Sequence, residues 1–199
     1  MPCDHRFMGD LTPSFPLQYL FVGTFNPSWD NPNGNNANWY YGRRTNDFWY
    51  IMPQVFGHQS LMPRQFRTNP DFLRKWCEKN SIGVTDLISS IQDANENNPE
   101  HKDWILGMQD EHLENFDDIA CTRINNIIEE NHDTLQGIYL TRYTHTLDQQ
   151  GILFRLWNNV VNVCNQYQIP HASLVTPSRG YRVMNRNQKL HSWQQIINT

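Results

Sequence analysis

Asparagine, aromatic and arginine side chains crowd one stretch near the N-terminus of this chain. The stretch runs from Leu20 to Trp49 and has the sequence LFVGTFNPSWDNPNGNNANWYYGRRTNDFW. A solvated linker has no need for large aromatic side chains, whereas a pocket for a flat polar ring uses aromatic faces, amide groups and nearby cations. The stretch therefore indicates such a pocket. The alternative is that its aromatics are core residues beneath a long surface loop.

A second polar loop, Thr176 to Arg182, lies near the other end of the chain. Each loop follows a short apolar run with strand character, Leu20–Val22 for the first and Ala172–Val175 for the second. Ligands of parallel α/β sheets bind beyond the C-terminal ends of the strands. We therefore expect the two loops to face one crevice.

Strands and helices alternate along the chain. The expected strands are Leu20–Val22, Ile82–Ile88, Gly137–Thr141 and Ala172–Val175. The expected helices are Asp47–Met52, capped by Thr45 or Asn46, Pro70–Asn80, capped by Asn69, a weaker segment Trp104–Phe116, then Thr122–Asn131 and Gly151–Tyr167. The last segment, Arg186–Ile197, is expected to end in an amphipathic turn. Met1–Leu17 is expected to be an irregular lead-in. The alternation predicts an α/β fold with three layers, α/β/α, around a central, mostly parallel four-stranded sheet, and residues 1–199 as a single domain.

One carboxylate stands inside an otherwise apolar predicted strand. Asp86 lies near the end of Ile82–Ile88. A buried carboxylate is costly unless it is paired, so we expect Asp86 at the open end of the strand or hydrogen-bonded to neighbouring backbone. This structural explanation takes precedence over a functional one.

The amino-acid composition limits the classes of protein to which this chain can belong. Hydrophobic residues make up 38% of the chain, enough for a globular core, and the formal net charge of -4 gives no overall basic field for nucleic acid. A local basic patch remains feasible, since basic residues gather near the two loops. These are Arg43, Arg44, Arg179, Arg182, Arg186 and Lys189.

The four cysteines and eight histidines show no metal-binding spacing. We expect no metal, no cofactor and no disulfide framework, with the cysteines buried as reduced thiols. No secretory leader or membrane-spanning run is evident, so we expect a cytoplasmic monomer.

Both loops resemble signature segments of the uracil-DNA glycosylase superfamily. LFVGTFNPSW followed by WYYGRRTNDFW is similar to the Gly-x-Asn-Pro and Asn-x-Phe-Trp motifs of the mismatch-specific uracil-DNA and thymine-DNA glycosylases. It is closer still to the Tyr-Tyr and Asn-x-Phe-Trp spacing of the hypoxanthine-DNA glycosylase branch. Val175–Arg179 resembles the Pro-Ser loop that pinches the DNA backbone in this superfamily. The resemblance covers most of the chain, and Gln92–Phe116 matches least well.

Carried onto this sequence, the resemblance assigns Asn46 and Asn26 to catalysis. Asn46 matches an Asn that is essential in the hypoxanthine branch, and Asn26 matches the Asn that positions water in the mismatch-specific branch. Tyr41 matches the aromatic that stacks on the extruded base. The other base-binding candidates are Phe25, Tyr40, Asp86 and Thr176. The candidates for contact with the DNA backbone are Pro177, Ser178, Arg179, Arg182, Arg43 and Arg44, and a side chain from Arg179–Arg182 is expected to fill the gap left in the duplex.

The sequence also departs from the family pattern. One additional residue separates Gly23 from Asn26, so Phe25 is the candidate for the place that Asn takes in the motif. Thr176 stands where the most active branch has a His that stabilises the leaving base, and we expect slower or narrower catalysis for that reason. Each candidate has a structural explanation too. Tyr41 fits the core, Asn46 a helix cap, Thr176 and Ser178 a turn closed by hydroxyls, and the arginines a solvated surface.

The expected function is a monofunctional DNA glycosylase that excises uracil or hypoxanthine. Cleaving an N-glycosidic bond needs donors for the base carbonyls and a placed water, which amides supply without a nucleophile or a metal. The first loop contains no lysine that could form a Schiff base, so a lyase step is not expected. The alternatives are a nucleic-acid- or nucleotide-binding domain with weakened catalysis and an enzyme acting on a free nucleoside. A basic rim favours DNA, and an acidic rim counts against it.

Overall fold

Four parallel strands form the centre of the molecule, as the alternation of elements predicts. The computed structural model describes residues 1–107, 110–144 and 147–198. The central strands lie in the order β3-β2-β6-β7 and neighbouring strands run parallel. Their bounds are Tyr19–Gly23 for β2, Ile82–Asp86 for β3, Gly137–Leu140 for β6 and His171–Ser173 for β7. The two inner strands, β2 and β6, are almost wholly apolar because helices cover both faces of the sheet.

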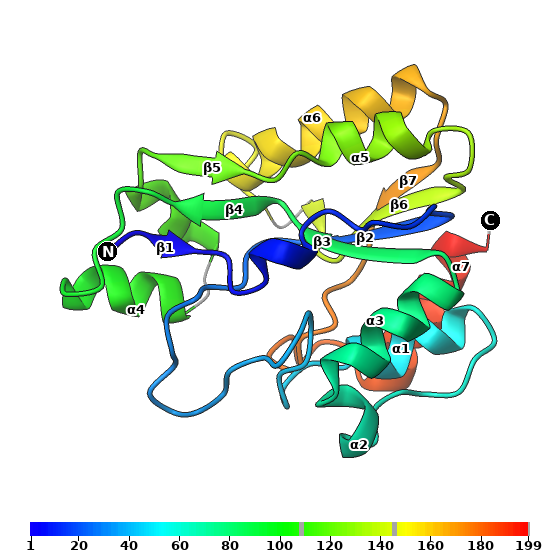
Figure 1. The fold of residues 1–199 in the computed structure, drawn as a ribbon, viewed down its shortest axis with the longest axis horizontal. Helices are drawn as coiled ribbons and strands as arrows, with labels where there is room; N and C mark the ends of the chain where they lie inside the picture. Colours follow the sequence, from blue (N-terminus) through cyan, green and yellow to red (C-terminus); the bar gives the residue numbers. More distant parts are fainter. Residues whose placement is uncertain (108–109, 145–146, 199) are drawn as a thin grey trace.

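Helices flank this sheet on both sides, which confirms the three-layer α/β/α prediction (Figure 1). One face carries α1 (Phe48–Val55), α3 (Pro70–Lys79) and α7 (Arg186–Ile197), and the short α2 (Arg64–Arg67) precedes α3. The opposite face carries α5 (Ile124–Asn131) and α6 (Ile152–Gln166).

Side chains of β2 alternate between the two cores, as the two-residue repeat of a strand requires. Phe21 stacks on Trp193 of α7, with ring centroids 5.6 Å apart. Leu20 and Val22 point to the other face, where they pack in one cluster with Trp157 of α6. The sheet is therefore anchored on both sides, and its C-terminal edge is held in a fixed position.

A second, antiparallel sheet lies beside the first and was not predicted. It contains β1 (Cys3–Asp4), β4 (Ile88–Ile91) and β5 (Ile119–Cys121), in the order β1-β4-β5. The prediction of one strand over Ile82–Ile88 was wrong, since β3 ends at Asp86 and the chain then changes sheet. The apolar run gives no sign of this change, because both strands are buried. The irregular lead-in was also wrong, since it holds β1 and a 3-10 helix, η1 (Met8–Asp10).

The polar insertion between β4 and β5 folds into α4 (Pro99–Gly107) and the 3-10 helix η2 (Asp110–Asn115). Residues 108–109 of the expected segment Trp104–Phe116 lie outside the described residues. Helical structure is therefore found on both sides of them, and the expectation of a helical segment there is confirmed for the described part.

Local hydrogen bonds explain where helices begin and end. Asn69 caps α3, as predicted, because its side chain accepts from the N–H of Phe72 at 3.1 Å. Pro53 lies inside α1, where proline leaves the carbonyl four residues earlier without its helical donor. That carbonyl belongs to Trp49, and it accepts from the N–H of Leu61 at 2.8 Å instead. The helix therefore continues through the proline.

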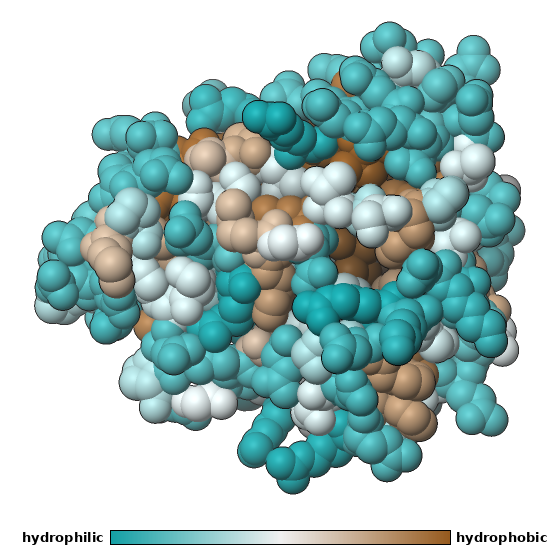
Figure 2. All heavy atoms as spheres, in the orientation of Figure 1, coloured by the Kyte–Doolittle hydropathy of each residue, from teal (hydrophilic) through white to brown (hydrophobic). Residues whose placement is uncertain are grey.

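The cysteines follow the expectation only in part. Cys3, Cys77 and Cys164 are buried, whereas Cys121 on β5 is exposed. In the space-filling view, hydrophilic residues dominate the periphery of the molecule and hydrophobic residues show mainly towards its middle (Figure 2). Among the described residues, none of the helices has the length and apolar character needed to cross a membrane.

Candidate active site

The two polar loops meet at the C-terminal edge of the parallel sheet. Asn46 and Ser178 form an isolated antiparallel bridge. Next to it, the N–H of Asp47 donates to the carbonyl oxygen of Pro177 at 2.9 Å. These main-chain contacts join the two loops directly, so both lie at this edge of the sheet, and a crevice shared by the two loops stays a prediction.

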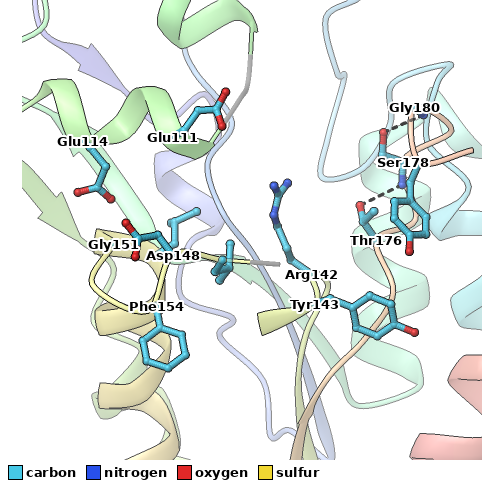
Figure 3. Close-up of a pocket in the computed structure, with 13 residues that line it drawn as sticks. Glu111, Glu114, Arg142, Tyr143, Asp148, Gly151, Phe154, Thr176, Ser178 and Gly180 are labelled. Atoms are coloured by element: carbon cyan, nitrogen blue, oxygen red, sulfur yellow. Dashed lines mark hydrogen bonds between the residues drawn. The ribbon is translucent and has the colours of Figure 1, made fainter. Parts of the chain in front are cut away.

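A groove of about 850 Å³ opens beside the second loop. Thr176 and Ser178 lie on one side, Glu111 and Glu114 lie on the other, and Arg142 points between them (Figure 3). A concave site of this size takes a small molecule or a single nucleotide. Its walls differ in charge, since the wall formed by η2 is acidic.

The carboxamide oxygen of Asn46 is engaged in a hydrogen bond within the fold. Its Oδ1 accepts from the N–H of Phe48 at 2.8 Å and closes a turn that leads into α1. The predicted cap at Thr45 or Asn46 was wrong, since the N-cap of α1 is Asp47. In the described part of the chain, its Nδ2 has no hydrogen-bond partner. An amide whose oxygen is engaged acts through its N–H groups, so Asn46 can recognise an acceptor such as a carbonyl oxygen.

Tyr41 sits in a backbone conformation that non-glycine residues seldom adopt, with φ of 55°. Its ring stacks on Phe48, with centroids 3.9 Å apart and planes 11° from parallel. One ring face is therefore covered, and only the opposite face can take a base. Its hydroxyl lies 3.1 Å from the Thr141 hydroxyl, which itself donates to the carbonyl oxygen of Val22, so Tyr41 is the donor. Burial raises the pKa of Tyr41, and the charge of Asp86 raises it further.

Asp86 ends strand β3 and is 1% exposed. Its Oδ2 accepts from Nδ2 of Asn26 at 2.6 Å and lies 2.9 Å from Nε2 of His5. Nδ1 of His5 accepts from the N–H of Phe7 at 3.0 Å, so a neutral ring carries its proton on Nε2 and donates it to Asp86. Asp86 thus lies at the strand end and is hydrogen-bonded, though by side chains rather than by backbone. Asn26 acts here as its support, and a direct role for Asn26 with water stays a prediction.

Gly23 leaves room for two of these groups to converge. A Cβ at this position would lie 2.2 Å from Oδ1 of Asp86 and 2.7 Å from the hydroxyl of Tyr41. Any side chain there would displace one of them. The glycine that ends β2 is therefore required by the close approach of Asp86 and Tyr41.

Phe25 and Tyr40, both base-binding candidates, lie in the core. They are 4% and 0% exposed, and their rings pack on His5 with centroids 5.9 and 5.5 Å away. Their burial fits the alternative in which the loop aromatics are core residues. The hydroxyl of Tyr40 is buried without a hydrogen-bond partner among the described residues, and burial together with Asp86 raises its pKa.

Hydroxyl groups close the second loop on itself, as the structural explanation proposed. Oγ1 of Thr176 accepts from the N–H of Ser178 at 3.3 Å, and Oγ of Ser178 accepts from the N–H of Gly180 at 3.2 Å. The side chain of Lys189 on α7 donates a hydrogen bond to the carbonyl oxygen of Ser178. Lys189 is 1% exposed, and burial lowers its pKa. The loop is therefore a rigid platform.

The arginines of the two loops differ in their surroundings. Arg179 donates from Nε to Asp47 at 2.8 Å, so it joins the loops to each other. Arg44 and Arg182 are exposed, while Arg43 is half-buried. The two loops therefore carry positive charge, whereas the wall of the groove formed by η2 is acidic.

Sequence reasoning missed three residues that hold this site together. His5 supports Asp86, Asp47 pairs with Arg179 and Arg186, and Lys189 supports the second loop. The requirement that a buried carboxylate be paired signals a partner for Asp86 without identifying it. Contacts between distant segments leave no pattern in the sequence.

The fold resembles the solution NMR structure of a protein from Methanosarcina acetivorans that bears the name "putative uracil DNA glycosylase". The likeness covers 92% of this chain and 94% of that chain, with a TM-score of 0.53 and 16% sequence identity. The chain shares the fold of that protein. This finding confirms the expected architecture. No family model matches the sequence, and neither does any curated protein.

Proposed function

We propose that this protein is a monofunctional DNA glycosylase that extrudes and hydrolytically excises a deaminated or mismatched base, uracil or hypoxanthine. The main-chain pairing of Asn46 with Ser178 carries the proposal. It sets the amide, the Tyr41 ring and the Pro-Ser loop at the edge of the sheet where α/β folds bind ligands. The fold shared with a protein named as a uracil DNA glycosylase adds support.

The free half of Asn46 supports a base with a carbonyl group. Deamination of cytosine or adenine replaces an exocyclic amino group by a carbonyl oxygen. Nδ2 of Asn46 can donate to that oxygen. If the base carried an amino group instead, two donors would face each other and neither would have an acceptor. Asn46 would therefore favour uracil over cytosine and hypoxanthine over adenine.

Contacts with DNA would come from the basic side of the site. Pro177 and Ser178 would press on the backbone, and the exposed Arg44 and Arg182 would contact phosphates. Val183, beside them, is 75% exposed, unusual for a large apolar side chain. It would fill the space that the extruded base leaves in the stack. The acidic wall across the groove would keep phosphates on the arginine side.

The chemistry would need little covalent participation from the protein. The base would depart with the bonding electrons while positive charge grows on the sugar, and water would add to C1′. Residues 23–46, the first loop, contain no lysine, so a simple hydrolysis is proposed rather than a lyase step. The protein would act on DNA as a cytoplasmic monomer without a cofactor.

A nucleic-acid- or nucleotide-binding domain is the second candidate. The side chain of Asn26 is bonded to Asp86, and Oδ1 of Asn46 is bonded to Phe48, so amides expected to serve catalysis also serve the fold. A domain of this kind would bind the same ligands without cutting them.

Excision assays separate these candidates. Labelled oligonucleotides carrying uracil, hypoxanthine, xanthine or a G·T mismatch, single- and double-stranded, are incubated with excess protein and then treated with alkali. Strand cleavage at uracil or hypoxanthine, with none in undamaged DNA, is the expected result. Tight binding without cleavage of any probe would instead establish the binding domain, and absence of both would direct attention to free nucleosides.

A further inference from the structure

Arg43 differs from the other arginines of the two loops in being half-buried without an ion-pair partner. Its Nε is buried and has no hydrogen-bond partner among the described residues. Within the same part of the chain, no carboxylate lies within ion-pair distance of it, whereas Arg179 is bonded to Asp47. Arg44, its neighbour in the sequence, is exposed.

The position of Arg43 places its charge at the site. Its carbonyl oxygen accepts from the N–H of Asn46 at 3.1 Å, so the two residues begin and end one tight turn. The guanidinium lies close enough to Asp86 and Arg6 to feel both charges. Burial and the charge of Arg6 lower the pKa of Arg43, and the charge of Asp86 opposes this effect.

Asp86 does not neutralise this cation directly. Its Oδ2 is occupied by His5 and Asn26, and the salt bridge that Asp86 forms is with His5. Arg6 repels Arg43 and is itself held by Asp30 at 2.9 Å. A partly buried cation without an anion beside it is energetically costly, so a negatively charged group that binds next to Arg43 would be stabilised.

We propose that Arg43 is a catalytic residue whose guanidinium donates to a carbonyl oxygen of the extruded base and stabilises the negative charge that the base acquires as it leaves. This inference rests on the proposed glycosylase function. It supplies the stabilisation that Thr176 cannot give, because a hydroxyl carries no positive charge. A contact with a DNA phosphate fits Arg43 less well than Arg44, since the Nε of Arg43 is buried whereas Arg44 is exposed to solvent, where a phosphate would lie.

The reaction balances without any further reagent. The bond between C1′ and the base nitrogen breaks, and its electron pair leaves with the base, which becomes an anion delocalised onto the carbonyl oxygen beside Arg43. The oxygen of a water forms the new bond to C1′. The proton that this water loses neutralises the departed base, so the products are an abasic site and the free base.

Arg43→Met and the control Arg155→Met, at an exposed arginine of α6, test this role. Excision is measured in single turnovers, and affinity is measured with DNA carrying a 2′-fluoro nucleotide that resists cleavage. We expect Arg43→Met to slow excision by about 100- to 1,000-fold while affinity falls far less, as for loss of a donor to a developing anion. Arg155→Met is expected to keep both the excision rate and the affinity for DNA within about threefold of the wild type.

The acidity of the leaving base gives a readout that a structural role would not alter. 5-Fluorouracil leaves more readily as an anion than uracil, so Arg43→Met is expected to slow its excision about tenfold less than that of uracil. Arg43→Gln replaces Arg43→Met if the latter does not fold. Equal loss for both bases, or an Arg43 variant that behaves like Arg155→Met, overturns the inference while glycosylase activity stands. A wild-type protein that excises no base removes both the proposed function and the inference.

Discussion

Asn46 and Ser178 lie opposite each other in an antiparallel bridge that closes the two ends of the chain around one edge of the sheet. A second main-chain bond, from the N–H of Arg179 to the carbonyl oxygen of Thr45 at 2.7 Å, flanks the bridge. The loop that carries the candidate base-binding groups and the loop that resembles a DNA clamp therefore move as one unit. Disturbing either is expected to disturb both.

Asn46 has two roles that substitutions can separate. Asn46→Asp keeps the oxygen that accepts from the N–H of Phe48 and removes the N–H donor, whereas Asn46→Ala removes both. We expect both variants to lose most excision activity, and only Asn46→Ala to lose about 1 kcal/mol of unfolding free energy. Denaturant unfolding and single-turnover excision measure the two effects. Full activity in Asn46→Asp would show that the amide N–H does not contact the base.

Gly23 tests the convergence of Asp86 and Tyr41. Gly23→Ala places a methyl group 2.2 Å from the Asp86 carboxylate, so we expect a loss of roughly 2–3 kcal/mol of unfolding free energy together with lost activity. Gly9→Ala is the control, because a Cβ there meets nothing within 4 Å. Equal melting temperatures for the two variants would mean that the strand end adjusts freely.

Asp47 is a buried carboxylate held by two guanidinium groups, Nε of Arg179 at 2.8 Å and Nε of Arg186 at 3.0 Å. Asp47→Asn keeps the shape and removes the charge, and we expect it to lower the unfolding free energy by about 2 kcal/mol. Asp71→Asn breaks an exposed pair with Arg74 and should cost well under 1 kcal/mol. Chemical denaturation of both variants decides the matter, and a similar cost for both would contradict a special role for Asp47.

The buried hydroxyl of Tyr139 leads us to expect that the free energy of unfolding falls at alkaline pH. Burial raises its pKa from 10.0 to about 12, so the folded state keeps the proton that the unfolded state loses. The stabilisation is complete below pH 10 and is lost as the pH rises from 10 to about 12. Comparing Tyr139→Phe with the wild type, we expect the wild type to lose roughly 1–2 kcal/mol more over this range, with some screening by solvent. Parallel stability curves for the two proteins would exclude the effect.

Local patterns determined much of this architecture. The apolar runs and helical spacing predicted the four parallel strands and the helices that flank them, and Asn69 and Pro70 marked the start of α3, because these signals act within a few residues. The polar loops at the strand ends were predicted to share a crevice for the same reason. Parallel strands bring their C-terminal ends to one edge whatever the rest of the chain does.

Tertiary structure alone decided which side chains serve this edge. The sequence marked Asp86 as a carboxylate in need of a partner, but only the pairing of β1 with β4 brings His5 to it, and β1 was not predicted at all. Arg43 and Arg44 are adjacent residues of the same type, so the sequence does not tell them apart. In the structure, Arg43 is half-buried near Asp86 and Arg44 is exposed. The composition of a segment determines its local conformation, whereas burial and charge at a site depend on segments that meet only after folding.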